Sequence, residues 1–82
     1  MPLFFLSYDL REESDYETLY DELKNFNAVR ILESIWCFKR TGTSAKELRM
    51  YFKNFIDSDD GLIVSEVKDW SSYKANGTPN DL

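Results

Sequence analysis

Two kinds of apolar pattern alternate along the chain and predict its secondary structure. Short runs of β-branched, aromatic and other large apolar residues predict strands, and they cover residues 3–10, 28–33, 34–40 and 62–68. The first run, LFFLSYDL, has apolar side chains on both faces of a strand, because successive side chains point in opposite directions. The middle run is too long for one strand, so a break at Glu33 and Ser34 is expected.

Between these runs, apolar residues recur at the spacing of one helix face. The stripes predict a helix over about residues 14–26 and a second helix over about residues 45–56. Two pairs with capping-box spacing stand at the helix starts: Ser14 with Glu17, and Ser44 with Glu47. The turn-forming sequence DSDDG follows the second stripe and predicts the end of that helix.

The predicted order is β-α-β-β-α-β, followed by a polar tail. Each helix has a single apolar stripe and follows a strand after a short connection. The economical packing is a ferredoxin-like α+β fold, in which a four-stranded antiparallel sheet has both helices on one face. We expect one domain over residues 1–68 and a C-terminal tail over residues 69–82 that packs on a dimer partner.

The strands are more apolar than an open-faced sheet requires. Two helices cover only one face, so strands whose other face meets water should alternate apolar with polar residues. Stretches such as LFFL at residues 3–6 do not alternate, and soluble monomers rarely expose large apolar patches. A homodimer packed about a two-fold axis would cover the second face. The alternative is a monomer whose tail folds back, with Trp70 and Tyr73 covering that face.

Composition and charge narrow the function. The chain has 82 residues, 43% of them apolar, and a net charge of −5, which is unusual for a protein that neutralises phosphates. It has no histidine, so catalysis would depend on carboxylates, hydroxyls or a hard metal ion. The single cysteine, Cys37, excludes an internal disulfide and is typical of a reducing cytoplasm, where we expect the protein. No apolar stretch has the length of a membrane span.

Three stretches carry a family resemblance: FFLSYDL with its terminal Tyr-Asp, VRILESIW, and DGLIVSEV. They resemble the small CRISPR-associated adaptation protein and its stand-alone SinR-like relatives, and more remotely the virulence-associated toxin endoribonucleases. The resemblance covers about residues 3–68 and implies a ferredoxin-like homodimer. It also implies that Asp9 faces its symmetry mate across a cleft, where some members hold a divalent cation for phosphodiester cleavage. Many relatives act instead as scaffolds that contact nucleic-acid backbone.

Asp9 is the candidate catalytic residue and metal ligand. Two copies would bring two Asp9 carboxylates together, enough to hold one Mg²⁺ or Mn²⁺ with waters. Such an ion activates a water or stabilises charge on a scissile phosphate, and Arg11 lies close enough in sequence to grip that phosphate. Without the resemblance, Asp9 is interpreted as a turn residue or as the partner of Arg11, and this alternative stays open.

Basic residues supply further candidate contacts to nucleic acid. Besides Arg11, five form the basic cluster: Lys39, Arg40, Lys46, Arg49 and Lys53. The last three share one helix face, and with the hairpin end they predict a phosphate-contacting ridge. The alternative is a solvated helix surface. Glu33 and Glu66 lie in apolar segments and are interpreted as solvated edge residues or as partners of Arg30 or Lys68.

These features predict a cytoplasmic homodimer that binds the phosphate backbone of RNA or DNA and is a candidate Mg²⁺-dependent endonuclease. The alternative is a non-catalytic dimeric assembly module that presents its acidic surface to a protein partner. The missing histidine and the net charge of −5 favour the assembly module. Asp9 and the family resemblance favour the nucleic-acid-binding protein.

Overall fold

The computed structural model describes residues 1–11 and 16–82. Its main elements are β1 (Leu3–Asp9), α1 (Tyr16–Asn25), β2 (Val29–Leu32), β3 (Ile35–Lys39), α2 (Ala45–Phe52) and β4 (Gly61–Val67). Two short 3₁₀ helices, Lys53–Phe55 and Pro79–Asp81, complete them. The succession of strands and helices is the predicted one, and Glu33 and Ser34 form the predicted turn. No helix within the described ranges is long and apolar enough to cross a membrane.

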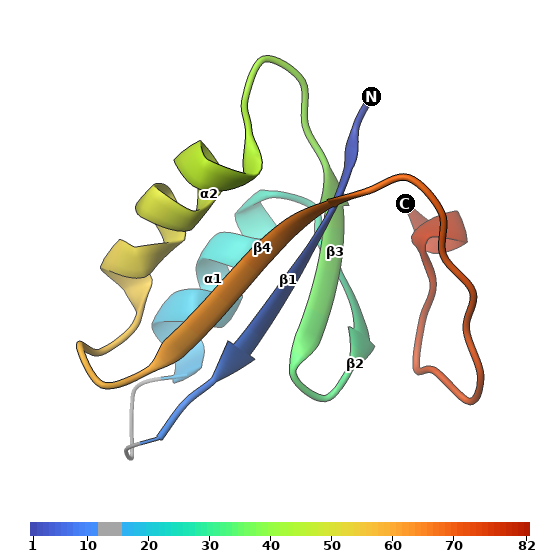
Figure 1. Cartoon of the computed structure of the whole chain (residues 1–82). Coiled ribbons are helices and arrows are strands. Elements are labelled where there is room, and N and C mark those ends of the chain that lie inside the picture. The colour runs from blue at the N-terminus through green and yellow to red at the C-terminus, as the bar shows by residue number, and fades with distance from the viewer. Residues whose placement is uncertain (12–15) are drawn as a thin grey trace.

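The four strands form one antiparallel sheet in the order β2-β3-β1-β4, with α1 and α2 on the same side of it (Figure 1). The predicted α+β architecture, a four-stranded antiparallel sheet with two helices, is confirmed. β1 is central, and its seven residues all pair with β4, from Leu3 opposite Val67 to Asp9 opposite Gly61. Asp9 therefore lies at the very end of the central strand.

The core fills the space between the helices and one face of the sheet. Its fully buried members are Phe4, Leu6, Leu19, Leu23, Phe38 and Phe52. Trp36 belongs to the same cluster and is only 6% exposed. Trp36 and Phe38 are therefore core residues, and their rings are not free to stack on bases.

The helix boundaries follow their caps only in part. Ser44 is the N-cap of α2, and its hydroxyl accepts a hydrogen bond from the Glu47 amide at 3.2 Å, which is one of the two bonds of the predicted capping box. The apolar stripe continues beyond α2, but the chain tightens into the 3₁₀ turn Lys53–Phe55. The other predicted box falls on Ser14, which lies outside the described residues.

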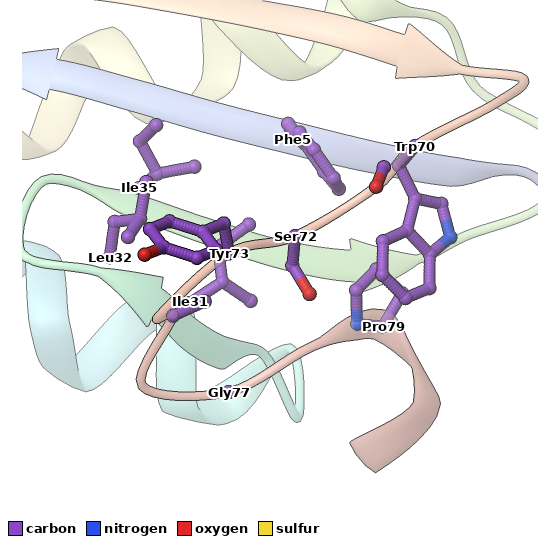
Figure 2. Close-up of a pocket in the computed structure, with 11 residues that line it drawn as sticks. Phe5, Ile31, Leu32, Ile35, Trp70, Ser72, Tyr73, Gly77 and Pro79 are labelled. Atoms are coloured by element: carbon purple, nitrogen blue, oxygen red, sulfur yellow. The ribbon is translucent and has the colours of Figure 1, made fainter.

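The C-terminal tail covers half of the second face of the sheet. It passes over β2 and β3 on the side away from the helices (Figure 2), and the Asn76 amide donates to the Ile31 carbonyl at 2.9 Å. Between tail and sheet lies a mainly apolar cavity of about 150 Å³, whose lining includes Phe5, Ile35 and Trp70. We call this the covered half.

The covered half confirms part of the monomer alternative and corrects another part. The tail does fold back, and Trp70 is half-buried in the cavity lining as expected. Tyr73, however, is 82% exposed although it borders the cavity, so its ring covers little of the sheet. The burial comes instead from Pro79, which is buried in the last turn of the tail.

The second half of this face, formed by β4 and by β1 from Ser7 to Asp9, carries no such cover from the described segments (Figure 1). β4 is an edge strand of the sheet, and its Ile63 side chain is 68% exposed. Ser65 is also exposed, and Ser7 of β1 is half-buried. We call this the bare half; it ends at Asp9.

Candidate nucleic-acid interface

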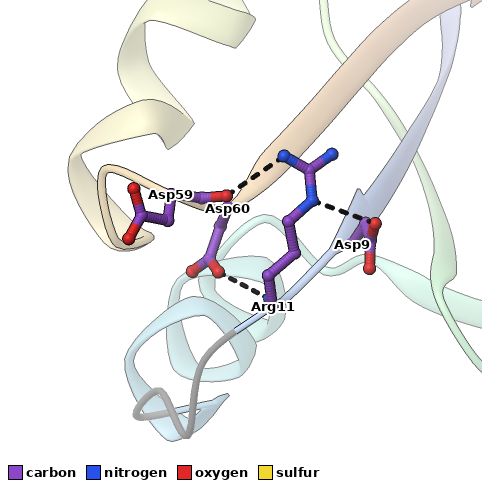
Figure 3. A network of polar contacts seen from close by, with 4 residues as sticks. All are labelled: Asp9, Arg11, Asp59 and Asp60. Atoms are coloured by element: carbon purple, nitrogen blue, oxygen red, sulfur yellow. Dashed lines mark hydrogen bonds and ion pairs between the residues drawn. The ribbon is translucent and has the colours of Figure 1, made fainter.

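Asp9 lies at the end of β1 with its carboxylate in solvent. The side chain is 71% exposed, and its Oδ2 atom accepts a hydrogen bond from Arg11 Nε at 3.2 Å (Figure 3). The predicted closeness of Asp9 and Arg11 is therefore real, and the two form an ion pair. The interpretation of Asp9 as the partner of Arg11 describes this single copy correctly.

Arg11 is held in place by the loop before β4. Its backbone amide donates to Asp60 Oδ1 at 2.8 Å, and its guanidinium Nη1 donates to the Asp59 carbonyl at 3.2 Å (Figure 3). The other carboxylate oxygen of Asp60 accepts from the Asp57 amide at 2.9 Å, which fixes the loop itself. The DSDDG sequence is thus more than a helix stop: it positions the arginine beside Asp9.

Gly61 provides the space that the arginine occupies. A Cβ atom at this position would lie 3.0 Å from Arg11 Nη2 and 3.8 Å from Asp9 Cβ. Real Cβ atoms are rarely that close to another group, so the guanidinium lies across Gly61 because no side chain is present there. Residue 61 therefore contributes to the site by its lack of a side chain.

A shallow hollow of about 340 Å³ opens beside this ion pair. Its lining joins the ends of β1 and β4: Ser7, Tyr8, Asp9, Arg11, Gly61, Leu62 and Ile63. The hollow therefore combines a charged end, Asp9 and Arg11, with the exposed apolar side chain of Ile63 on the bare half. The size and charge of the Arg11 end suit a phosphate group, whereas the Ile63 end suits an apolar contact.

The family model of CRISPR associated protein Cas2 matches residues 1–75 of this chain. The chain belongs to the Cas2 family. The match runs from the N-terminus into the C-terminal tail, so it includes the sheet, both helices and the Asp9–Arg11 pair. No solved structure matches the chain. The predicted likeness to SinR-like proteins and to toxin endoribonucleases lies beyond this match and stays a prediction.

The predicted Mg²⁺ or Mn²⁺ site is not assembled within one copy of this Cas2 family chain. Among the described residues, no group of three or more carboxylate, cysteine or histidine side chains is placed to hold a metal ion. Asp9 contributes a single carboxylate, and Arg11 already occupies one of its oxygens. A cation at Asp9 therefore requires a second donor set, which a second copy of the chain would bring.

Two residues of the basic cluster, Lys39 and Arg40, lie at the other end of the sheet from the Asp9–Arg11 pair. Lys39 pairs with Leu3 at the opposite end of β1, about 20 Å from Asp9 by the rise of a strand. The guanidinium of Arg40 stacks on the Phe26 ring at 3.9 Å and is partly taken up by that contact. The other three residues of the predicted ridge are exposed, Lys46 and Arg49 on α2 and Lys53 in the 3₁₀ turn that follows it.

The sequence interpretation missed a second hollow next to Asp9. Its volume is about 160 Å³, and it lies between α1, the end of β1 and the β2–β3 turn. Its lining consists of Tyr8, Asp9, Leu10, Tyr16, Tyr20, Arg30, Glu33 and Ser34, and we call it the tyrosine–arginine pocket. Tyr8 was a usable signal, because a tyrosine on the buried face of a strand needs a partner for its hydroxyl.

The two predicted edge glutamates agree with one of their interpretations, whereas Arg30 differs from its expected role as a carboxylate partner. Glu33 and Glu66 are both exposed, in agreement with solvated edge residues. Arg30, however, donates from Nε to the backbone carbonyl of Glu33 at 3.0 Å, and not to a carboxylate. The guanidinium is thus fixed by the turn itself and keeps its charge available to a ligand.

Proposed function

We propose that this Cas2 family chain acts in CRISPR adaptation as a homodimer that holds nucleic-acid backbone between two Asp9–Arg11 ends. The observation that supports this most is the position of an exposed, loop-held arginine at the end of the bare half, next to the exposed apolar side chain of Ile63. Family membership supports the role in adaptation.

The dimer follows from the bare half of the sheet. Ile63 lies on the edge strand β4, two residues from Gly61, and is 68% exposed. Water contact with such a group is removed when a second copy packs on it. Because a two-fold axis repeats every residue, the contact would place one Asp9–Arg11 pair from each copy along the same seam. The strand order β2-β3-β1-β4 with two helices also supports our assignment of each copy as ferredoxin-like.

The tail contributes to this dimer as well. The tail is already hydrogen-bonded to β2 through Asn76 and Ile31, and its Tyr73 side chain is 82% exposed. We assign Tyr73 and the neighbouring tail residues to the rim of the partner contact, as expected from the sequence. The central contact remains the bare half, because there the apolar exposure is adjacent to the charged site.

Arg11 is the group that grips phosphate. Its side chain is 60% exposed, and its guanidinium can exchange the Asp9 carboxylate for a phosphate oxygen without moving the backbone, which Asp60 holds. Arg49 and the other exposed cations of α2 add weaker, longer-range attraction. Two arginine contacts per dimer predict a slope of log affinity against log salt of about −1.8 for duplex DNA and about −1.4 for a single strand.

A second candidate function is Mg²⁺-dependent cleavage of the bound strand. It is favoured by one feature, the exposure of the Asp9 carboxylate at the seam, where two copies would supply two carboxylates. A divalent cation held there supplies charge stabilisation at a scissile phosphate. When the cation binds Asp9, Arg11 would leave the Asp9 carboxylate and bind the phosphate instead.

Fluorescence anisotropy with labelled RNA and DNA, each as single strand and duplex, tests the binding function at low and rising salt. Arg11→Gln should weaken binding about tenfold or more, because it removes a charged hydrogen bond from each copy. Lys24→Gln is the matched control: it removes the same charge from an exposed position on α1. Equal losses in both variants would show that only net charge matters and would contradict the proposed site.

Cation binding is measured separately, by the electron paramagnetic resonance signal of Mn²⁺ titrated into the protein. One Mn²⁺ per dimer, lost in Asp9→Asn while the dimer persists, supports the metal assignment. Degradation of labelled strand that stops with EDTA and with Asp9→Asn supports cleavage. Absence of binding to all four nucleic acids at low salt would instead favour the non-catalytic assembly module.

A further inference from the structure

The tyrosine–arginine pocket shares a wall with the backbone site. Asp9 lines both the hollow beside Arg11 and this second hollow, which lies on the helix side of β1. A chain of nucleotides held at Arg11 would therefore lie next to the pocket. The lining is mainly polar, with hydroxyl groups from Tyr20 and Ser34 beside the arginine.

The guanidinium of Arg30 is the most constrained group in the pocket. It lies over the Tyr20 ring at 5.1 Å and near the Trp36 ring at 5.9 Å, so aromatic faces support it. Nε donates to the Glu33 carbonyl, and Nη2 donates to the Tyr20 hydroxyl at 3.3 Å. Among the described residues no carboxylate forms an ion pair with it, and Nη1 has no partner there.

The tyrosines make the pocket rigid. The Tyr8 hydroxyl lies 3.0 Å from both the Tyr20 hydroxyl and the Glu33 carbonyl, which ties β1 to α1 and to the β2–β3 turn. Burial and the hydrogen bond to Tyr20 raise the pKa of Tyr8 to about 12, so its hydroxyl stays protonated in physiological conditions. Tyr16 stands at the rim, 42% exposed, with its ring 6.1 Å from that of Tyr20.

We propose that this pocket takes one unpaired nucleobase of a single-stranded nucleic acid whose adjoining phosphate is held at Arg11. Arg30 has only donors, which suit the carbonyl oxygen or ring nitrogen of a base. Tyr16 offers an exposed ring face for stacking. A base in duplex is already paired and stacked, so it does not enter. This inference rests on the proposed backbone-binding function and adds a preference for single strands to it.

The test compares three labelled ligands by anisotropy: a single strand, the same strand with every base replaced by an abasic site, and the duplex. Wild-type protein should bind the single strand about tenfold more tightly than the abasic strand, the range expected for stacking of one base. Arg30→Gln and Tyr16→Leu should each remove most of that difference. Both variants should bind the abasic strand and the duplex as the wild type does.

Matched controls remove similar groups elsewhere. Lys24→Gln removes an exposed positive charge from α1, and Tyr73→Leu removes a tyrosine ring that is 82% exposed on the tail. Circular dichroism confirms that each variant is folded; Tyr16 is exposed enough that Tyr16→Leu remains informative if Arg30→Gln unfolds. A strand containing 4-thiouridine, irradiated and analysed by mass spectrometry, should cross-link to α1 at or next to Tyr16.

The outcomes separate the two proposals. Binding of neither strand nor duplex by the wild type overturns the backbone-binding function itself. Arg11-dependent binding that is equal for normal and abasic strands leaves the backbone site standing and overturns the pocket. A loss of single-strand binding in Arg30→Gln that extends equally to the duplex also overturns it, because a simple charge effect then explains the result.

Discussion

The two halves of the second sheet face differ in how much of their apolar surface they leave exposed to water. On the covered half the tail lies over β2 and β3, and Ile31 and Cys37 are 7% and 0% exposed. On the bare half Ile63 is 68% exposed, and the surface runs into the Asp9–Arg11 pair. On the covered half the apolar side chains are thus buried by the tail of the same chain. On the bare half an apolar side chain remains exposed next to the charged pair.

The comparison teaches that apolar content alone does not identify a partner surface. Both halves carry apolar residues at alternate positions of their strands, and from this pattern a partner could be expected over the entire face. Because the tail covers β2 and β3, no partner is needed over these two strands. What remains is a smaller surface, and it is the one adjacent to the candidate chemistry.

Deletion of residues 69–82 should produce the largest effect on the covered half. Without the tail, Ile31 and its apolar neighbours meet water, and burial of two such side chains is worth about 3 kcal/mol or more. We expect the urea midpoint to fall accordingly and Cys37 to become reactive with a thiol reagent. Deletion of Leu82 alone is the control. Unchanged stability and an unreactive thiol would show that the tail does not cover this half.

Alkaline pH should lower the free energy of unfolding, because the Cys37 thiol is buried on the covered half. Burial raises the pKa of this thiol from 9.0 to about 11, so the unfolded chain loses the proton before the folded one does. The contribution to stability is full below pH 9 and is lost as the pH rises towards 11, up to about 3 kcal/mol. Urea unfolding at pH 8 and pH 10.5 should show a steeper loss in wild type than in Cys37→Ala. Parallel losses in the two proteins would contradict this.

Gly77→Ala should have a smaller effect on the same contact. A Cβ atom there would lie 3.0 Å from the Arg30 carbonyl and from Val29 Cγ1, so the tail must move away from β2. Such overpacking costs about 1–2 kcal/mol. Asn80→Ala, an exposed change in the same tail, is the comparison variant for the urea midpoint. Equal midpoints would place the tail farther from β2 than described.

Most of the architecture could be predicted from the sequence because periodicity records burial directly. The break at Glu33 and Ser34, the two helices and the four strands follow from it. Most boundaries are shifted by one or two residues, but α2 ends at Phe52, four residues before the predicted end. The docking of the tail was one of two alternatives that the sequence left open, since Trp70 and Pro79 follow no period. Their burial depends on where the sheet places β2, which is a matter of tertiary packing.

The candidate site was only partly predictable for a similar reason. Asp9 and Arg11 are neighbours in sequence, so their pairing was among the expected alternatives. The loop that fixes Arg11 comes from residues 57–60, and the pocket partners of Arg30 come from three elements. Sequence spacing does not show that a guanidinium will choose a turn carbonyl over a nearby carboxylate.

The central claim, that the bare half is a homodimer surface bringing two Asp9–Arg11 ends together, is tested most directly by light scattering of Ile63→Glu. Met50→Glu, which charges a side chain that is 54% exposed on α2, is the matched control. At micromolar concentration we predict twice the chain mass of 9.7 kDa for wild type and Met50→Glu, and 9.7 kDa for a folded Ile63→Glu. A monomeric wild type, or a dimer that Ile63→Glu leaves intact, would contradict the account.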